Sequence, residues 1–262
     1  MKVDAHTHVF VQGMPLVPHP RHTPDYGFTV EQLIATLDAH QIDKCVIAAA
    51  SPWGDYNDYV IASLRRFPAR LRGTIIADPA LLGPYEMAQM QRDGVVGVRL
   101  PFINMATIPD LDSWAYRKFL RRIADLDWHV HLHIEGSKLS DVLPVLERSG
   151  VKIVIDHIGR LGPQDGPDSD GFQAMVHAIE RGRTWVKLSA AYRLGEYARG
   201  QARALCARVG HERMFWASDC PFVGCESSVT YRQTMDWLTE TIRDPHARDQ
   251  VFGENANKFY FS

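Results

Sequence analysis

Short apolar runs alternate with longer segments of helical periodicity along the whole chain. Most of these runs are continuously apolar and rich in β-branched residues, which is typical of parallel strands buried on both faces. They predict eight strands, at residues 2–8, 44–48, 73–77, 95–100, 128–133, 151–157, 184–189 and 213–218. The pattern therefore predicts a parallel sheet whose strands are separated by helices.

Segments with an apolar stripe at helical spacing follow the predicted strands. Thr29 opens one of them as a capping box with Gln32, because its hydroxyl can accept a hydrogen bond from the backbone N–H of Gln32. Residues 112–126 form another, with a stripe that contains Trp114. Pro144 should end or kink the first turn of a later helix. Residues 252–261 predict an extra helix at the end of the chain.

Eight strand–helix units fill the 262 residues without a linker or a break in composition. This favours an α/β fold with one domain over residues 1–262, a (β/α)8 TIM barrel with a C-terminal extra helix. An open doubly wound sheet would place a glycine-rich turn after the first strand, where the sequence reads Thr7-His8-Val9-Phe10. Long connections, at residues 9–28 and 159–171, follow predicted strands, and barrel enzymes carry their chemistry on that face.

Composition and charge exclude several classes of protein. With 45% hydrophobic and 23% charged residues, the chain is globular rather than disordered. The net charge of -2 gives no concentrated positive field, so no nucleic-acid partner is expected. No apolar run approaches the roughly 20 residues that cross a bilayer, so no membrane association is expected. The four cysteines form no C-x-x-C pair and no export signal is visible, which indicates a cytoplasmic protein with reduced thiols.

Ionisable residues gather at the predicted carboxyl ends of four strands. They are His6, His8, His133, His157 and Asp219. Because residues i and i+2 of a strand face the same side, His6 and His8 can both point into the barrel mouth. Imidazoles and a carboxylate from separate strands can bind a divalent transition metal. The same set can also hydrolyse a substrate without metal, with Asp219 as general base and imidazolium groups polarising a carbonyl. For His129 and His131, a hydrogen-bonded position in the core is the simpler interpretation.

Three motifs in order resemble the amidohydrolase superfamily. They are residues 3–10 (VDAHTHVF), 154–160 (VIDHIGR) and 215–221 (FWASDCP), and the resemblance covers nearly the whole chain. Gly97-Val98-Arg99 adds to it. The chain looks most like the amidohydrolase-2 branch, which contains pyrone-dicarboxylate hydrolase and sugar lactonases.

This resemblance implies a hydrolase that opens a small lactone. Asp219 would be the general base that activates water, and His157 would orient a reactant or act as an acid. His6 and His8 would polarise the carbonyl or position the water. Arginines would bind substrate carboxylates, for which a planar fork of donors is suited, although loop salt bridges are the structural alternative. The candidates are Arg99, Arg193 and Arg160.

The resemblance also bears on a cofactor. Metal-free pyrone-dicarboxylate hydrolase has a tyrosine at the place of His133, whereas the mononuclear zinc members have a histidine ligand there. The resemblance therefore favours one divalent metal ion, Zn²⁺, over a metal-independent site. Its ligands would be His6, His8, His133 and Asp219. A dinuclear site is not expected, because the seventh strand offers Lys187 and the fourth offers Arg99.

Three other functions stay open at this point. A zinc-dependent decarboxylase of the aminocarboxymuconate semialdehyde type would use the same ligands, and a lactone isomerase would move the acyl group within a sugar acid. A binding protein on an old enzyme scaffold is the non-catalytic alternative. Barrels of this kind are often homodimers, so a second copy is a possible partner. Five further histidines are predicted at the surface or at helix ends: His19, His22, His40, His177 and His211.

Overall fold

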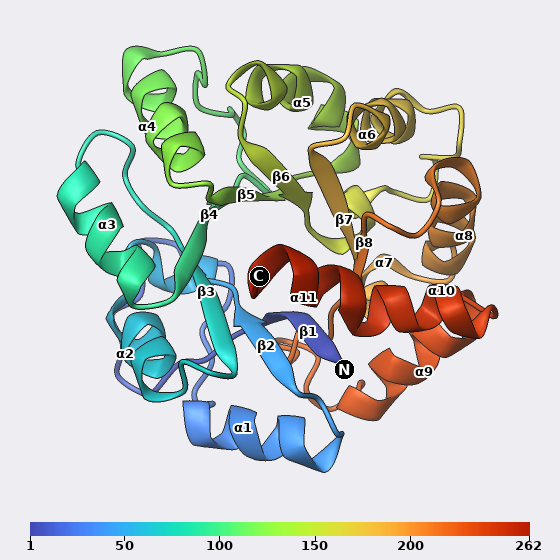
Figure 1. Cartoon of the computed structure of the whole chain (residues 1–262), viewed down its shortest axis with the longest axis horizontal. Coiled ribbons are helices and arrows are strands. Elements are labelled where there is room, and N and C mark those ends of the chain that lie inside the picture. The colour runs from blue at the N-terminus through green and yellow to red at the C-terminus, as the bar shows by residue number, and fades with distance from the viewer.

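The computed structural model describes all 262 residues. One sheet of eight parallel strands runs in chain order, and helices surround it (Figure 1). The strands are β1 (Val3–Thr7), β2 (Lys44–Ile47), β3 (Leu71–Ile75), β4 (Val95–Pro101), β5 (His129–His133), β6 (Lys152–Ile155), β7 (Thr184–Leu188) and β8 (Met214–Trp216). The (β/α)8 barrel predicted from the sequence is confirmed.

The helices form the outer ring. They are α1 (Val30–Ala39), α2 (Asp58–Arg66), α3 (Pro84–Arg92), α4 (Trp114–Asp125), α5 (Leu139–Arg148), α6 (Asp170–Glu180), α7 (Ala191–Leu194), α8 (Ala198–Val209), α9 (Tyr231–Thr241), α10 (Pro245–Asp249) and α11 (Asn255–Tyr260). The capping box of Thr29 and Gln32 is present at the start of α1. The extra terminal helix is also confirmed, and Figure 1 shows α11 crossing the end of the barrel where the chain begins. None of the helices combines the length and apolar character needed to cross a bilayer.

The third strand lies two residues earlier than the predicted range of 73–77. It ends at Ile75 because the side chain of Asn57 takes over the backbone of the next residue. The Ile76 N–H donates to Asn57 Oδ1 at 3.1 Å, and Asn57 Nδ2 donates to the Ile76 carbonyl at 2.8 Å. A side chain thus replaces the sheet partner, which an apolar pattern does not reveal.

Two details of the helix predictions differ from the structure. Pro144 does not end α5, because the helix continues through it, and a kink there stays a prediction. The buried face of that helix, which includes Leu143 and Leu146, offsets the roughly 3 kcal/mol that an interior proline costs. Trp114 is 71% exposed at the first position of α4 and does not join the stripe of Phe119.

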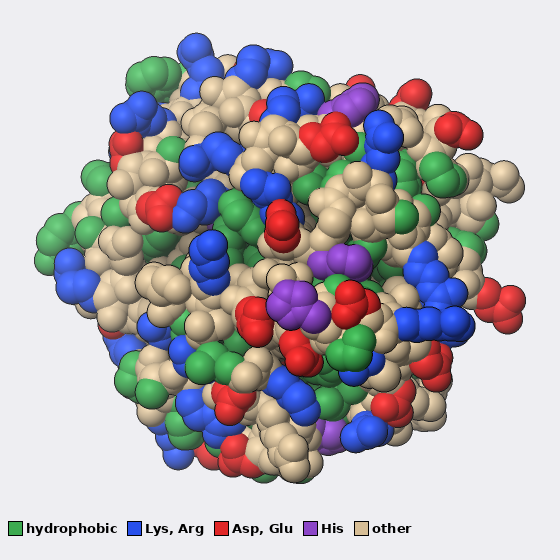
Figure 2. All heavy atoms as spheres, turned by 45° about the vertical axis from the view of Figure 1, so that its right-hand side comes forward, with side chains coloured by type: hydrophobic (Ala, Val, Ile, Leu, Met, Phe, Trp, Pro, Cys, Tyr) green, Lys and Arg blue, Asp and Glu red, His purple; other side chains and the backbone are tan.

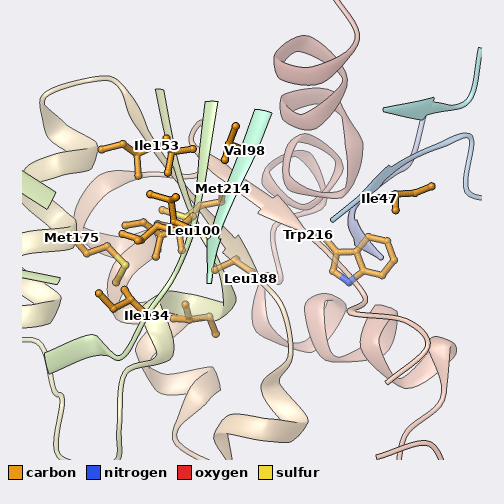
Figure 3. Packing of buried hydrophobic residues seen from close by; sticks show 14 of the residues in the cluster. Ile47, Val98, Leu100, Ile134, Ile153, Met175, Leu188, Met214 and Trp216 are labelled. Carbon is orange, nitrogen blue, oxygen red and sulfur yellow. The ribbon is translucent and has the colours of Figure 1, made fainter. Parts of the chain in front are cut away.

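Two apolar layers enclose the sheet. The larger lies between the strands and the helices, and Figure 3 labels members of it from β4, β6, β7 and α6. The smaller fills the barrel interior at its amino-terminal end, where Phe215 and Val154 pack against Tyr260 of α11. Charged side chains of both signs are interspersed over the outer face shown in Figure 2. Beyond this smaller layer, toward the carboxyl ends of the strands, polar side chains occupy the barrel interior.

Strand β5 contributes a histidine to each level of the interior. His129 packs on Tyr260 at the end of the barrel that α11 covers. His131 Nε2 lies 3.2 Å from the Tyr260 hydroxyl, and His133 lies at the opposite end of the strand. The neighbouring Gly97 makes room for this column, since a Cβ there would lie 2.5 Å from the carbonyl oxygen of His129. The interpretation of His129 and His131 as core residues is consistent with their near-complete burial.

Candidate active site

Backbone hydrogen bonds close the barrel at the place where the predicted residues meet. The Asp219 N–H donates to the His6 carbonyl at 3.0 Å, and the His8 N–H donates to the Cys220 carbonyl at 2.8 Å. These bonds hold the end of β1 beside the segment that follows β8. Asp219 Oδ1 consequently lies 3.7 Å from His6 Nε2, 3.4 Å from His8 Nε2 and 3.8 Å from His157 Nε2. The structure brings together these four residues, as the sequence predicts.

The backbone around the site is strained. His157 through Arg160 all have positive φ, from 49° to 68°, and Asp219 has a φ of 66°. A left-handed conformation costs an L-residue roughly 1–2 kcal/mol, and a β-branched residue such as Ile158 is a marked outlier there. This turn ends β6 two residues before the predicted boundary and directs the His157 ring toward Asp219. Strain concentrated on the site residues is typical of functional positions.

The two carboxylate oxygens of Asp219 have different surroundings. Oδ2 accepts hydrogen bonds from the Tyr192 hydroxyl at 2.7 Å and from Arg193 Nε at 2.8 Å. Oδ1 faces the three imidazoles. Burial alone would raise the pKa of Asp219, but the imidazoles and the guanidinium that face it hold the pKa well below its usual range. Asp219 is therefore a fixed carboxylate whose Oδ1 is the atom available to a reactant.

Hydrogen-bond partners define the proton positions on two of the rings. His8 Nδ1 lies 2.7 Å from the carbonyl of Ala48, which can only accept, so Nδ1 carries a proton, and in the neutral ring the lone pair is on Nε2. His133 Nδ1 lies 3.2 Å from Arg99 Nη2, which can only donate, so His133 carries its proton on Nε2. That buried Nε2 has no hydrogen-bond partner. It is an unsatisfied donor at the mouth of the site.

A charged cluster below this level was not predicted. Asp156 Oδ1 lies 3.0 Å from Lys187 Nζ, and Asp156 Oδ2 accepts from Arg99 Nε at 3.1 Å. All three residues are almost fully buried. Burial lowers the pKa of Lys187 to about 8, although Asp156 opposes this shift. The sequence did contain one indication of this cluster. Lys187 lies on an otherwise apolar strand, and a buried lysine requires a buried partner.

The predicted arginines occupy different places. Each of the Arg99 side-chain nitrogens has a partner, since Nη1 donates to the Ala49 carbonyl at 3.0 Å in addition to the bonds described above. Arg193 donates to Asp219 and to the Val223 carbonyl. Arg160 is partly buried, and its pKa is lowered by burial and by the charge of Arg193. Binding of substrate by these three residues stays a prediction.

Sequence reasoning missed two residues at the mouth. Arg21 and His22 come from the long loop after β1 and line a cavity of about 50 Å³ above Asp219. Burial and the charges of Arg160 and Arg193 lower the pKa of Arg21. His22 was predicted at the surface but lines this cavity instead. A wider hollow of about 520 Å³ adjoins it and shares His22 and Val223, so it forms an approach to the site.

The donor atoms near Asp219 have the spacing of a metal site. His6 Nε2 and His8 Nε2 are 3.3 Å apart, and their distances to Asp219 Oδ1 are 3.7 and 3.4 Å. Four-coordinate zinc with ligand distances of about 2.0–2.1 Å places neighbouring donor atoms about 3.4 Å apart. His133 lies outside this group, and its predicted role as a metal ligand stays a prediction. A second group, His6, His131 and Asp156, surrounds Lys187 Nζ, so a cation already lies there.

Known proteins share this fold and sequence pattern. The chain is 26% identical over 230 residues to 4-sulfomuconolactone hydrolase of Hydrogenophaga intermedia, which spans 84% of this chain and 75% of that protein. It is 27% identical over 236 residues to 2-pyrone-4,6-dicarboxylate hydrolase of Comamonas testosteroni, covering 84% and 76%. A crystal structure of a probable 2-pyrone-4,6-dicarboxylic acid hydrolase from Acinetobacter baumannii, with citric acid bound, superposes with a TM-score of 0.93 at 28% identity, covering 99% of this chain and 98% of that one.

A family model describes almost the entire length of the chain. The match runs over residues 3–261 and carries the description amidohydrolase. It includes every residue of the site described above, from His6 in the first strand to Asp219 after the last. The chain therefore belongs to the amidohydrolase family.

Proposed function

We propose that this protein hydrolyses a small lactone that carries carboxylate groups. The observation that carries the proposal is the position of Asp219 Oδ1, which faces three imidazole Nε2 atoms within 3.8 Å while Oδ2 is held by Tyr192 and Arg193. Relatives named for the hydrolysis of a lactone and of a pyrone support the reaction class. Release of acid from a panel of carboxylated and uncharged lactones at near-neutral pH tests it, and a panel without any turnover would contradict it.

The residues of the site divide the reaction between them. A water molecule between Asp219 Oδ1 and the lactone carbonyl carbon loses its proton to Oδ1 as its oxygen bonds to that carbon. N–H donors such as His133 Nε2 stabilise the negative charge that develops on the carbonyl oxygen. The ring C–O bond then breaks, and the proton held by Asp219 passes to the departing oxygen. One water is consumed, and the product is a hydroxy acid or its keto tautomer.

The charges at the mouth favour a substrate with carboxylates. Among the neighbouring charges, that of Arg160 lowers the pKa of Arg21 most, and the opposing effect of Asp219 is smaller. Guanidinium groups in this situation are stabilised by an anionic ligand, which they can bind through two parallel hydrogen bonds. The related crystal structure contains citric acid, a carboxylate-rich molecule. We therefore infer that Arg21 and Arg160 bind carboxylates of the substrate.

Replacing Arg21 with glutamine should weaken binding of a carboxylated lactone. We expect KM to rise about 10-fold with little change in kcat, because a bond to a charged group contributes about 1.5–3 kcal/mol and this one lies away from the reacting carbon. Steady-state kinetics with carboxylated and uncharged lactones measures the effect. Arg208→Gln, on the exposed face of α8, is the matched control. An equal loss with both lactones would contradict the assignment.

Titration of His157 or Asp219 should not change the rate on the acidic side of neutrality. Burial lowers the pKa of His157 to about 3, and the pKa of Asp219 lies well below 3.8. Both groups thus keep one protonation state as the pH falls through about 6.5, where an ordinary imidazole gains a proton. A profile of kcat/KM should therefore contain no inflection from either group between roughly pH 5 and pH 7, and nitrogen NMR of the His157 ring should detect no titration there. A His157 signal that titrates near the ordinary imidazole value would contradict this expectation.

A zinc form of the same hydrolase is the second candidate, and the spacing of the donor atoms favours it. His6, His8 and Asp219 would hold the ion. Bound zinc would supply Lewis-acid polarisation of the carbonyl and a more acidic water. The proton positions decide between the two forms, since His8 presents a lone pair at Nε2 and a ligand role for His6 requires the same of its Nε2.

A further inference from the structure

Lys187 contacts the proposed catalytic machinery from below. It has no accessible surface, and its Nζ lies 2.9 Å from His6 Nδ1, 3.2 Å from His131 Nδ1 and 3.0 Å from Asp156 Oδ1. An ammonium group has three protons and no lone pair. The contacts therefore match its hydrogen-bonding capacity, with one proton for each neighbouring acceptor.

This arrangement determines where His6 carries its own proton. If the Lys187 ammonium donates to Nδ1, the lone pair of the ring is on Nδ1 and the proton is on Nε2. The opposite tautomer has a possible partner as well, because Asp156 Oδ1 lies 3.2 Å from the same Nδ1. A proton on Nδ1 would, however, point at a second donor only 2.9 Å away. Lys187 thus selects one of two tautomers that the pocket could otherwise hold.

The selected proton faces the reacting region. His6 Nε2 lies 3.3 Å from His8 Nε2, and in the neutral His8 ring that atom is an acceptor because His8 Nδ1 donates to the Ala48 carbonyl. The two rings therefore complement each other when His6 carries the Nε2 proton. Arg99 acts in the same way on His133 from the other side of Asp156. Lys187 and Arg99 are thus two buried cations that share Asp156. Each of them orients one imidazole N–H, on His6 and on His133, toward the same pocket.

We propose that Lys187 is a positioning residue that holds His6 as its Nε2–H tautomer, so that the N–H that faces His8 Nε2 in the free protein donates to the lactone carbonyl oxygen when substrate is bound. The identity of that acceptor rests on the proposed function. The same tautomer removes the lone pair that zinc requires at His6 Nε2. Lys187 consequently commits the pocket to polarisation by hydrogen bonds instead of by a metal ion.

Neutralisation of Asp156 does not by itself account for Lys187. Arg99 already compensates the carboxylate, and burying a second positive charge beside it carries a desolvation cost. The contacts that distinguish Lys187 from a simple counter-ion are those to the two imidazoles. If Lys187 were apolar, Asp156 Oδ1 would accept the proton of His6 Nδ1. That is the carboxylate–histidine arrangement that supports a metal ligand.

The unmodified protein provides the first test. Long-range proton–nitrogen correlation spectra of the histidine side chains distinguish an N–H nitrogen from one with a lone pair, and His6→Gln identifies the His6 signals. We expect the His6 ring to have a protonated Nε2 and an unprotonated Nδ1 near neutral pH. The protein as purified should contain far less than one equivalent of zinc. A proton on Nδ1 of His6, or one tightly bound zinc, would overturn it.

Lys187→Met provides the second test. Lys152→Met is the control, because Lys152 forms its ion pair and hydrogen bonds with the exposed Asp127. In Lys187→Met, the proton of His6 should move to Nδ1 and zinc affinity, measured against a chromophoric chelator, should rise about 10-fold or more. Without added metal, kcat should fall about 100-fold with a smaller change in KM, because one donor to the developing charge is lost. An unchanged tautomer and unchanged zinc affinity in a folded variant would overturn the proposal.

The tests separate this inference from the proposed function. Tautomer and zinc affinity are measured without substrate, so they decide the role of Lys187 even if no lactone is turned over. Failure of the lactone panel with the expected tautomer would contradict the reaction alone. If Lys187→Met does not fold, the spectrum and zinc content of the unmodified protein decide the question by themselves.

Discussion

Asp219→Asn should lose at least about 1,000-fold in turnover while the barrel stays folded, because general-base catalysis contributes up to about four orders of magnitude. The amide oxygen can still accept the bonds of Tyr192 and Arg193 that hold Oδ2. It cannot take a proton from water. Steady-state kinetics with the best lactone of the panel measures the loss, and circular dichroism checks the fold.

Asp236→Asn is a suitable control for this substitution. Asp236 pairs with Arg232 on the exposed side of α9, and its side chain is 48% accessible. Its activity should equal that of the unmodified protein. If Asp219→Asn kept more than about a tenth of the rate, a barrier change of only about 1.4 kcal/mol, Asp219 would not be the general base.

Asp156→Asn should produce the largest loss of stability. It leaves the buried charges of Lys187 and Arg99 without the carboxylate that both contact. Removing one partner of a buried ion pair costs about 3–5 kcal/mol. For a chain of this length, that lowers Tm by roughly 10 °C. Thermal unfolding monitored by circular dichroism measures the shift.

The control for Asp156→Asn is Asp127→Asn, because Asp127 pairs with Lys152 at a surface where its side chain is 75% accessible. Exposed pairs contribute about 0–1 kcal/mol, so its Tm should barely change. Equal Tm values for the two variants would show that another group compensates the buried cations. Burial alone would raise the pKa of Asp156, yet Lys187, His6 and Arg99 hold it well below 3.8. Its stabilising effect is therefore complete above the ordinary carboxyl pKa and is lost as the pH falls through the lowered one.

The sequence contained enough information for the barrel and for the group around Asp219. Parallel strands place their carboxyl ends at one edge of the sheet, so His8, His157 and Asp219 could be brought together from strand positions alone. Strand ends were less predictable. The third strand ends where Asn57 captures the backbone of Ile76, and such a contact depends on a residue from another segment.

Two other parts of the site could not be predicted, for separate physical reasons. Arg21 lies in a long loop without periodicity, so its position over Asp219 depends on tertiary packing. Proton positions on His6 and His133 depend on which donors face their Nδ1 atoms, Lys187 and Arg99. A histidine in a sequence motif can be a metal ligand or a hydrogen-bond donor, and only the neighbours of its second nitrogen distinguish them.

Turnover of the best lactone in ¹⁸O-enriched water tests the proposed reaction most directly, because it follows the attacking oxygen. A hydrolase adds one water, so mass spectrometry should find one heavy oxygen in the carboxylate formed from the lactone carbonyl, with all carbon retained. Transfer of the acyl group within the substrate would give an unlabelled product of unchanged mass, and decarboxylation would release carbon dioxide. Label in the new carboxylate would agree with attack by water activated at Asp219, and an unlabelled product or loss of carbon dioxide would contradict it.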